Sequence, residues 1–132
     1  MAHKAHLFSP DDTTTFDRIM ASTSPAEQKA LGQKVPNFDE DIWVAHRFEI
    51  VKWGNYLKFS QNKELKELLL GTGERELVEA SPRDKIWGVG FAAKNAEENR
   101  ARWGQNLLGL ALMAARKRIR KLEEEAKGEG GA

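Results

Sequence analysis

The 132-residue sequence contains no cysteine, only four prolines and three histidines. The absence of cysteine excludes disulfide bonds, thiolate catalysis and cysteine-ligated metal sites, and it fits a reducing compartment. No apolar run approaches the length of a membrane span, and the first residues lack the apolar stretch of a secretory signal peptide. A formal net charge of +1 gives no global field that would favour nucleic acid or a membrane surface. We therefore expect a soluble, cytoplasmic protein.

The residues that are present are those of an ordinary globular domain, 40% hydrophobic and 31% charged. Capping residues, glycines and the spacing of apolar residues predict a predominantly helical chain with about five helices. The long third helix carries a broad apolar face and is expected to be central. The expected helices cover residues 9–21, 24–32, 39–60, 62–71 and 104 into the 120s.

Residues 76–80 are the one good strand candidate, and Pro82 ends it. Residues 81–102 look like a long loop, which in a compact domain is usually functional or disordered. The expected fold class is therefore α+β, mostly helical, with a small strand element near residues 75–80. We expect one domain over residues 1–122 and a charged, glycine-rich disordered tail over residues 123–132.

The stretch "LVEASPRDKIWGVG", residues 77–90, combines residue types that suit a ligand site. Glu79 and Asp84 could divide acid and base roles, and Trp87 offers a flat apolar surface for a base or a sugar. Gly88 and Gly90 allow close approach of the backbone or a positive φ. The alternative is a glycine-rich surface turn with a packed tryptophan and solvated acids, which the residues alone slightly favour.

A second group lies on the last helix, where Asn106, Gly109, Met113 and Arg116 form a stripe beside the leucine face. Glycine between asparagine and arginine leaves room for something to pack closely. The alternative, favoured from the residues alone, is a helix–helix contact at Gly109 with Arg116 at its rim.

Three further features are ambiguous or carry little chemistry. Trp43 fits a core or boundary position better than a ligand site. The histidines have no partners at metal-ligand spacing, so we expect no metal. The basic run 116–121 is followed by acids at helical spacing, as in Arg120 with Glu124, which indicates a solvated helix face rather than a nucleic-acid patch.

Taken together, several of these motifs resemble the NADAR family, also called YbiA-like. The resemblance covers Met1 to about Leu122. It rests on the pairing of Glu79, Asp84 and Trp87-Gly88-x-Gly90 with Asn106-x-Leu108-Gly109-x-x-Leu112-Met113-x-x-Arg116. It extends to "MAHKAHLF", "SPAEQKALGQKV" and "WGNYLKFSQNKELKELLLGTG".

The resemblance implies a mostly helical α+β N-glycosidase that needs no cofactor. Its implied substrates are the ribosyl-aminopyrimidine phosphates of the riboflavin pathway, or ADP-ribose attached to guanine, including guanine in nucleic acid. The implied catalytic residues are Lys4, Glu79 and Asp84. The implied substrate-binding residues are Trp43, Trp87, Gly88, Gly90, Asn106 and Arg116.

The chain also departs from the family pattern. In the family a strand segment ending in a Glu-His pair stands before the motif "MAHKA", and this sequence starts at Met1. Gln33 stands where the family has an arginine. We therefore expect an N-terminally shortened domain, with an exposed face that a homodimer could cover. The alternative function is a catalytically impaired family member that binds nucleotides or ADP-ribose, or serves as an interaction module.

Overall fold

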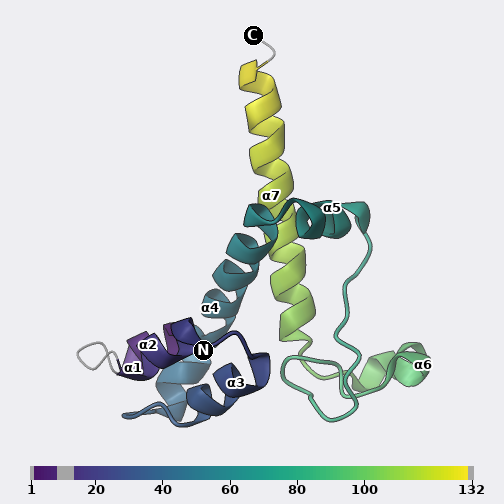
Figure 1. Cartoon of the computed structure of the whole chain (residues 1–132). Helices are drawn as coiled ribbons and strands as arrows, with labels where there is room; N and C mark the ends of the chain where they lie inside the picture. Colours follow the sequence, from purple (N-terminus) through teal and green to yellow (C-terminus); the bar gives the residue numbers. More distant parts are fainter. Residues whose placement is uncertain (1, 9–13, 131–132) are drawn as a thin grey trace. The chain divides into compact units, whose positions relative to one another are not determined.

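A computed structural model describes residues 2–8 and 14–130 of the chain (Figure 1). The chain forms two compact units, Met1–Ile50 and Val51–Ala132, called here the N-terminal and C-terminal units. No helix in the described ranges is long and apolar enough to cross a membrane. The elements are α1 (Ala2–Phe8), α2 (Thr14–Ala21), α3 (Pro25–Gln33), α4 (Glu40–Gln61), α5 (Lys63–Gly71), α6 (Ala93–Ala96), the 3-10 helix η1 (Glu97–Arg102) and α7 (Leu107–Gly130).

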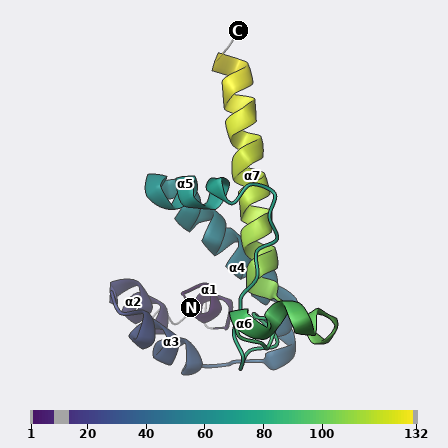
Figure 2. The ribbon, with the colours of Figure 1, turned by 90° about the vertical axis from the view of Figure 1, so that its right-hand side faces the viewer.

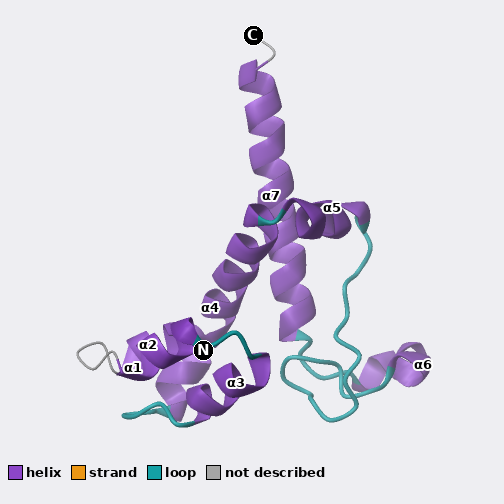
Figure 3. Ribbon diagram, viewed as in Figure 1, coloured by secondary structure: helices purple, strands orange, loops and turns teal. Residues whose placement is uncertain are grey.

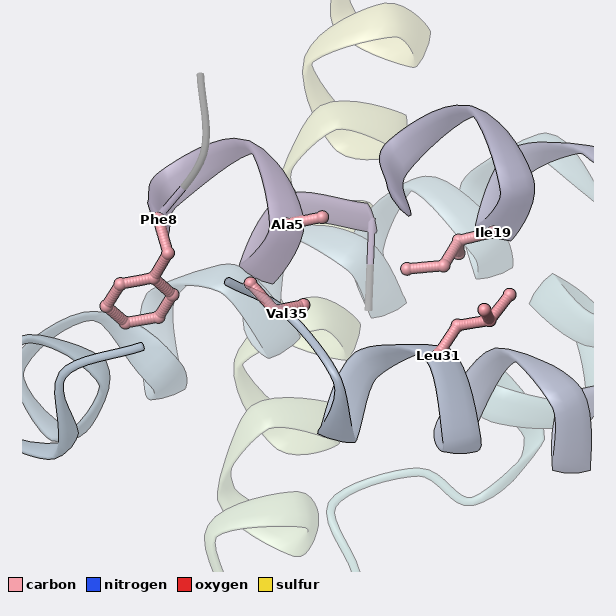
Figure 4. Packing of buried hydrophobic residues seen from close by; sticks show 5 residues of the cluster. All are labelled: Ala5, Phe8, Ile19, Leu31 and Val35. Carbon is pink, nitrogen blue, oxygen red and sulfur yellow. The ribbon is translucent and has the colours of Figure 1, made fainter. Parts of the chain in front are cut away.

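The N-terminal unit is built from α1, α2 and α3, which contact one another. The Ser24 side chain caps α3 by accepting a hydrogen bond from the N–H of Glu27, as the sequence predicts. The expected start of α2 at Ser9 lies outside the described residues, and α1 is a helix that the sequence did not indicate. The labelled side chains in Figure 4 form the core of this unit, namely Ala5, Phe8, Ile19, Leu31 and Val35.

Helix α4 begins in the N-terminal unit and ends in the C-terminal unit. Its bounds agree with the predicted helix over residues 39–60. The expectation that it would be central is wrong, because no residue of α4 is buried. Its large apolar side chains stay substantially exposed, including Ile42, Val44, Trp53 and Leu57.

The C-terminal unit has α5 packed against α7. Asn62 caps α5 by accepting a hydrogen bond from the N–H of Leu65, and Gly73 follows the helix with a φ of 64°. These features match the predicted start and end of this helix. The buried apolar residues of the unit are Leu69, Val89, Ala96, Ala111, Ala115 and Ile119.

The strand expected at residues 76–80 does not form, and the described part of the chain contains no strand (Figure 3). A strand needs a ladder of backbone hydrogen bonds to a neighbouring strand. Here the Asn106 side chain bonds the N–H of Glu79 and the carbonyl of Leu77 instead, at 2.9 and 3.0 Å. The segment is therefore extended chain held against α7, and the β part of the expected α+β class is not found in the described residues.

The region 81–102 is less irregular than expected, because it includes α6 and η1. At the other end, α7 continues to Gly130 and takes in most of residues 123–132, where the sequence led us to expect a disordered tail. Glutamate, alanine and lysine at 123–127 are strong helix formers, which accounts for the continued helix. The boundary of the NADAR-like domain at residue 122 remains a prediction.

Candidate active site

The turn that begins at Asp84 is organised by its own carboxylate. The Oδ1 atom of Asp84 accepts hydrogen bonds from the backbone N–H groups of Ile86 and Trp87, at 2.9 and 2.8 Å. This is the local pattern in which an aspartate side chain substitutes for a backbone acceptor in a turn. Asp84 therefore has a structural role, while its second carboxylate oxygen makes no hydrogen bond or ion pair to the described residues.

The same turn caps the N-terminal end of α7. Backbone carbonyls of residues 85–89 accept hydrogen bonds from the N–H groups just before and inside the first turn of the helix. The pairs are Gly104 to Val89, Gln105 to Lys85, Asn106 to Gly88, Leu107 to Ile86 and Leu108 to Trp87, all between 2.8 and 3.1 Å. Because the N–H groups of Leu107 and Leu108 are already used in this way, they are not free to hold a phosphate, as the first amides of a helix often do.

Asn106 connects the start of α7 to the extended segment before the turn. It is 7% exposed, and its side chain bonds the backbone of Leu77 and Glu79 as described above. Its own φ of 52° lies in the left-handed region, which asparagine tolerates better than most residues. The Asn106 side chain therefore orders residues 77–79, and the substrate contact that the resemblance implies for it stays a prediction.

Gly88 lies where the two acidic residues of the loop come together. A Cβ atom at Gly88 would lie 2.8 Å from the carbonyl oxygen of Glu79 and 2.9 Å from that of Asp84. The carbonyl of Glu79 also accepts the N–H of Val89 at 3.0 Å. The backbones that carry the two carboxylates are thus close neighbours only because residue 88 has no side chain.

The remaining loop residues flank this junction. The side chain of Trp87 is half-buried, so part of its ring surface is accessible to a ligand. Gly90 has a φ of 80°, a conformation that favours glycine, and it lies against the Lys85 side chain. Backbone and side-chain contacts thus join six residues into one loop cluster at the N-terminal end of α7, namely Glu79, Asp84, Trp87, Gly88, Gly90 and Asn106. In Figure 2 the loop between α5 and α6 reaches this end of α7.

Arg116 does not belong to this loop cluster. It lies ten residues along α7 from Asn106, which is about 15 Å of helix. Its Nη1 donates to the Thr72 hydroxyl at 2.8 Å. Gly109 is closely packed, as its place in the stripe suggested, but the backbone carbonyl of Leu77 fills the space rather than another helix or a ligand.

Lys4 and Trp43 lie in the N-terminal unit and contact each other. The Lys4 ammonium is 4.7 Å from the ring centroid of Phe38 and 5.3 Å from that of Trp43. The Trp43 ring also lies beside Phe8, at 6.5 Å between centroids. Burial lowers the pKa of Lys4 below its ordinary value, and the nearby Glu40 charge opposes part of that effect. A lysine with a lowered pKa is a better nucleophile near neutral pH, as Schiff-base chemistry requires.

The sequence reasoning missed one feature of the basic run 116–121. Lys117, Arg118 and Lys121 are exposed, as a solvated face requires, but Arg116 is buried, and Arg116, Lys117, Arg120 and Lys121 border one open depression. Their spacing of three and four residues was the available signal, because it places all four on one side of a helix. In the described ranges no group of three or more histidine, aspartate or glutamate side chains could hold a metal ion.

Comparison with known proteins agrees with the motifs. The sequence model of the NADAR domain matches residues 1–120. An N-glycosidase of Acanthamoeba polyphaga mimivirus is 50% identical over 120 residues, and an N-glycosidase of Nostoc punctiforme is 34% identical over 111. A riboflavin biosynthesis protein of Vibrio vulnificus is 28% identical over 111 residues. The chain belongs to the NADAR family.

The matched segments differ in how much of each protein they cover. They include 88% of this chain for the viral relative and 84% for each bacterial relative. They span 68% of the viral protein, 65% of the Nostoc protein and 28% of the Vibrio protein. These relatives are therefore longer than the region shared with this chain, and the Vibrio protein is much longer.

Proposed function

We propose that the chain is an N-glycosidase that hydrolyses the bond between a ribose carbon and a nucleobase-type nitrogen. The names of the relatives support this class of reaction. The candidate substrates are ribosyl-aminopyrimidine phosphates of the riboflavin pathway and ADP-ribose attached to guanine, in nucleic acid as well. The riboflavin biosynthesis relative supports the first of these.

The observation that carries the proposal is the close approach of the backbone carbonyls of Glu79 and Asp84 at Gly88, which makes the two residues that bear the carboxylates neighbours in the loop. Breaking the bond between C1 of ribose and nitrogen builds positive charge on C1 and the ring oxygen. A carboxylate beside C1 stabilises that charge or activates a water molecule, and a protonated group donates to the departing nitrogen. We assign the stabilisation of C1 or activation of water, and the donation of a proton to the nitrogen, to the pair Asp84 and Glu79. We assign stacking on the base to Trp87.

Lys4 offers a different chemistry. When the ribose ring of an N-ribosyl compound opens, C1 is left as an imine to the base nitrogen. A neutral lysine can add to C1 and form its own Schiff base while the base nitrogen leaves as the amine, and water then hydrolyses the Schiff base to free the lysine and the ribose aldehyde. The lowered pKa of Lys4 supports this alternative, and Trp43 would shield the reacting amine from water. Substitution separates the two chemistries, because Lys4→Arg keeps the positive charge but removes the nucleophile.

Asp84→Asn tests the proposal most directly, because the amide oxygen of asparagine can still accept the N–H groups of Ile86 and Trp87. We expect release of ribose phosphate, or removal of ADP-ribose from guanine, to slow by about 100-fold or more while stability stays near that of the wild type. Asp84→Ala should lose the turn as well as the activity. Glu98→Gln, an exposed acid in η1, is the control and should remain active.

Two results would count against this assignment. If the full chain released no ribose from either class of substrate, the N-glycosidase proposal would fail. ADP-ribose that raised the melting temperature without being turned over would then favour the alternative of a nucleotide-binding family member. If Asp84→Asn kept full activity, the reaction would not depend on that carboxylate.

A further inference from the structure

One side of the C-terminal half of α7 carries exposed apolar surface together with charges of both signs. Steps of three and four residues connect five of its side chains, so they share one side of the helix. They are Ala114, Arg118, Lys121, Leu122 and Glu125, called here the outer α7 face. Arg118, Lys121 and Glu125 are exposed, and Leu122 is 39% exposed. The half-exposed ring of Trp53 lies beside this face, with its centroid 5.1 Å from the guanidinium carbon of Arg118.

The end of α7 has few contacts with the rest of the C-terminal unit. Glu123 forms an ion pair with Lys66 of α5 at 2.8 Å. Beyond it, no hydrogen bond or ion pair joins residues 124–128 to another element of the described chain. In Figures 1 and 2 the last turns of α7 extend past α5. The NADAR match ends at residue 120, so the family resemblance assigns no role to this stretch.

The charged side chains of the outer α7 face form no ion pairs with the described residues. Lys121 and Glu125 are four residues apart, yet they do not pair with each other. The Arg118 guanidinium lies over the rings of Trp53 and Tyr56, with 5.1 and 5.6 Å from its carbon to the ring centroids. A guanidinium stacked on a ring keeps N–H groups at its edge that can donate to a carboxylate. Both signs of charge are therefore available to an incoming molecule.

The order of charge along α7 is complementary to itself. Five of the six residues 116–121 are cations, and residues 123–125 are all glutamates. Two parallel copies of this helix would place like charges at the same level, whereas two antiparallel copies place cations beside glutamates. Arg118 and Glu125 are about 10.5 Å of helix apart, and their midpoint lies next to Leu122. A two-fold axis at that midpoint brings Arg118 of each copy beside Glu125 of the other, with the two Leu122 side chains at the centre.

We propose that two copies of the chain associate through the outer α7 face, antiparallel and related by a two-fold axis. Burial of Leu122 and of the exposed part of Trp53 favours association. The pairs between Arg118 and Glu125 of the second copy set direction and register more than affinity. The contact covers about three turns of α7, which is small for a protein interface, so the dimer should dissociate on dilution. This surface differs from the N-terminal face for which the sequence suggested a homodimer.

Sedimentation equilibrium of the full chain over a range of concentrations tests the proposal, and we expect a reversible dimer. Arg118→Glu and Glu125→Arg each place like charges beside one another in the dimer. Each should raise the Kd of the dimer by about tenfold or more, which corresponds to about 1.4 kcal/mol. The matched controls Lys94→Glu and Glu98→Arg reverse exposed charges outside the outer α7 face and should dimerise as the wild type does.

A mixture of the two single variants gives the sharpest result. In a mixed dimer every charge at position 118 lies beside a charge of the opposite sign at position 125, so the mixture should dimerise with nearly the wild-type Kd. Far-UV circular dichroism checks that each variant is folded.

Four results would overturn the proposal. The wild type could stay monomeric up to millimolar concentration, or the controls could lose as much affinity as the face variants. The dimer could persist unchanged in both single variants, which would indicate another face, or the mixture could stay monomeric. The measurement needs no substrate turnover, so it is readable whether or not the N-glycosidase proposal holds.

Discussion

Asn106 shows how a single side chain can hold a candidate site together. Its amide group replaces the neighbouring strand that residues 77–79 lack, and its left-handed backbone directs the chain into α7. Neither the acids nor the tryptophan of the loop cluster has a comparable number of long-range bonds. The catalytic geometry assigned to Glu79 therefore depends on a residue that needs no contact with the substrate.

Asn106→Ala should destabilise the chain. The change removes two hydrogen bonds, leaves the N–H of Glu79 and the carbonyl of Leu77 without partners, and places alanine at a positive φ. We expect a loss of about 2–4 kcal/mol in the free energy of unfolding, measured by urea denaturation. Asn95→Ala, an exposed position in α6, should cost far less. Equal losses for the two variants would contradict the role given to Asn106.

The pKa of Lys4 can be measured through the reactivity of its amine. Burial lowers that pKa below 10.5, so Lys4 in the folded chain should react with an acylating reagent at lower pH than in the peptide AHKAHLF. Glu40→Gln removes the charge that opposes the shift, so it should lower the pKa further. Mass spectrometry of the modified lysine across a pH series gives the pKa of Lys4 in the wild type and in the Glu40→Gln variant.

The sign of the associated stability change follows from linkage. Because the pKa is lower in the folded chain, protonation of Lys4 opposes folding at pH values below that pKa. This unfavourable contribution to the free energy of unfolding disappears as the pH rises through the folded-state pKa of Lys4 toward 10.5. A folded-state pKa equal to or above that of the peptide would show that the aromatic rings do not shield the amine.

At the scale of elements, α7 is the scaffold of the C-terminal unit. Its first turn donates hydrogen bonds to the loop cluster, it packs against α5, and one of its sides borders the depression lined by Arg116 and Arg120. The extended segment after α5 runs beside this helix toward its N-terminal end (Figure 2). Close approach of that segment requires a small residue on the helix, and Gly109 supplies it.

Gly109→Ala should therefore be unfavourable, although alanine is the better helix former. The new Cβ would overlap the carbonyl oxygen of Leu77, so the segment or the helix must move. We expect a loss of about 1–3 kcal/mol in the free energy of unfolding. Gly128→Ala in the same helix meets no atom within 4 Å and should instead gain up to about 1 kcal/mol. A stabilising Gly109→Ala would show that the segment does not pack there.

At the scale of the whole molecule, the chain has two compact units joined through α4. Each has its own buried apolar residues, and each holds part of the candidate machinery. Lys4 and Trp43 lie in the N-terminal unit, whereas the loop cluster lies in the C-terminal unit. Units with separate cores are expected to open separately, as cooperative folding units do.

Leu31→Ala tests this separation. Leu31 is 5% exposed in the core of the N-terminal unit, and the truncation should cost about 2–5 kcal/mol. Hydrogen exchange should then speed up in α1, α2 and α3, while the amides of residues 105–108 keep their protection. Loss of protection in both units to the same degree would mean that the chain unfolds as one cooperative body.

The sequence determined the helices that have strong local signals. Ser24 and Asn62 cap their helices as expected, and the helical spacing of apolar residues located α4 and α7. Its motifs also identified the NADAR family, which the domain match confirms. Such features depend on residues within a few positions of one another, so they can be recognised without knowledge of the fold.

Only the tertiary structure decided what the long-range contacts do. It replaced the expected strand by a segment bonded to Asn106, and it left α4 without a buried residue. It separated Arg116 from the loop cluster and placed it in a cavity with other cations. The sequence could not specify these outcomes, because the partners are 27 to 44 residues apart along the chain and their meeting depends on how the intervening elements pack.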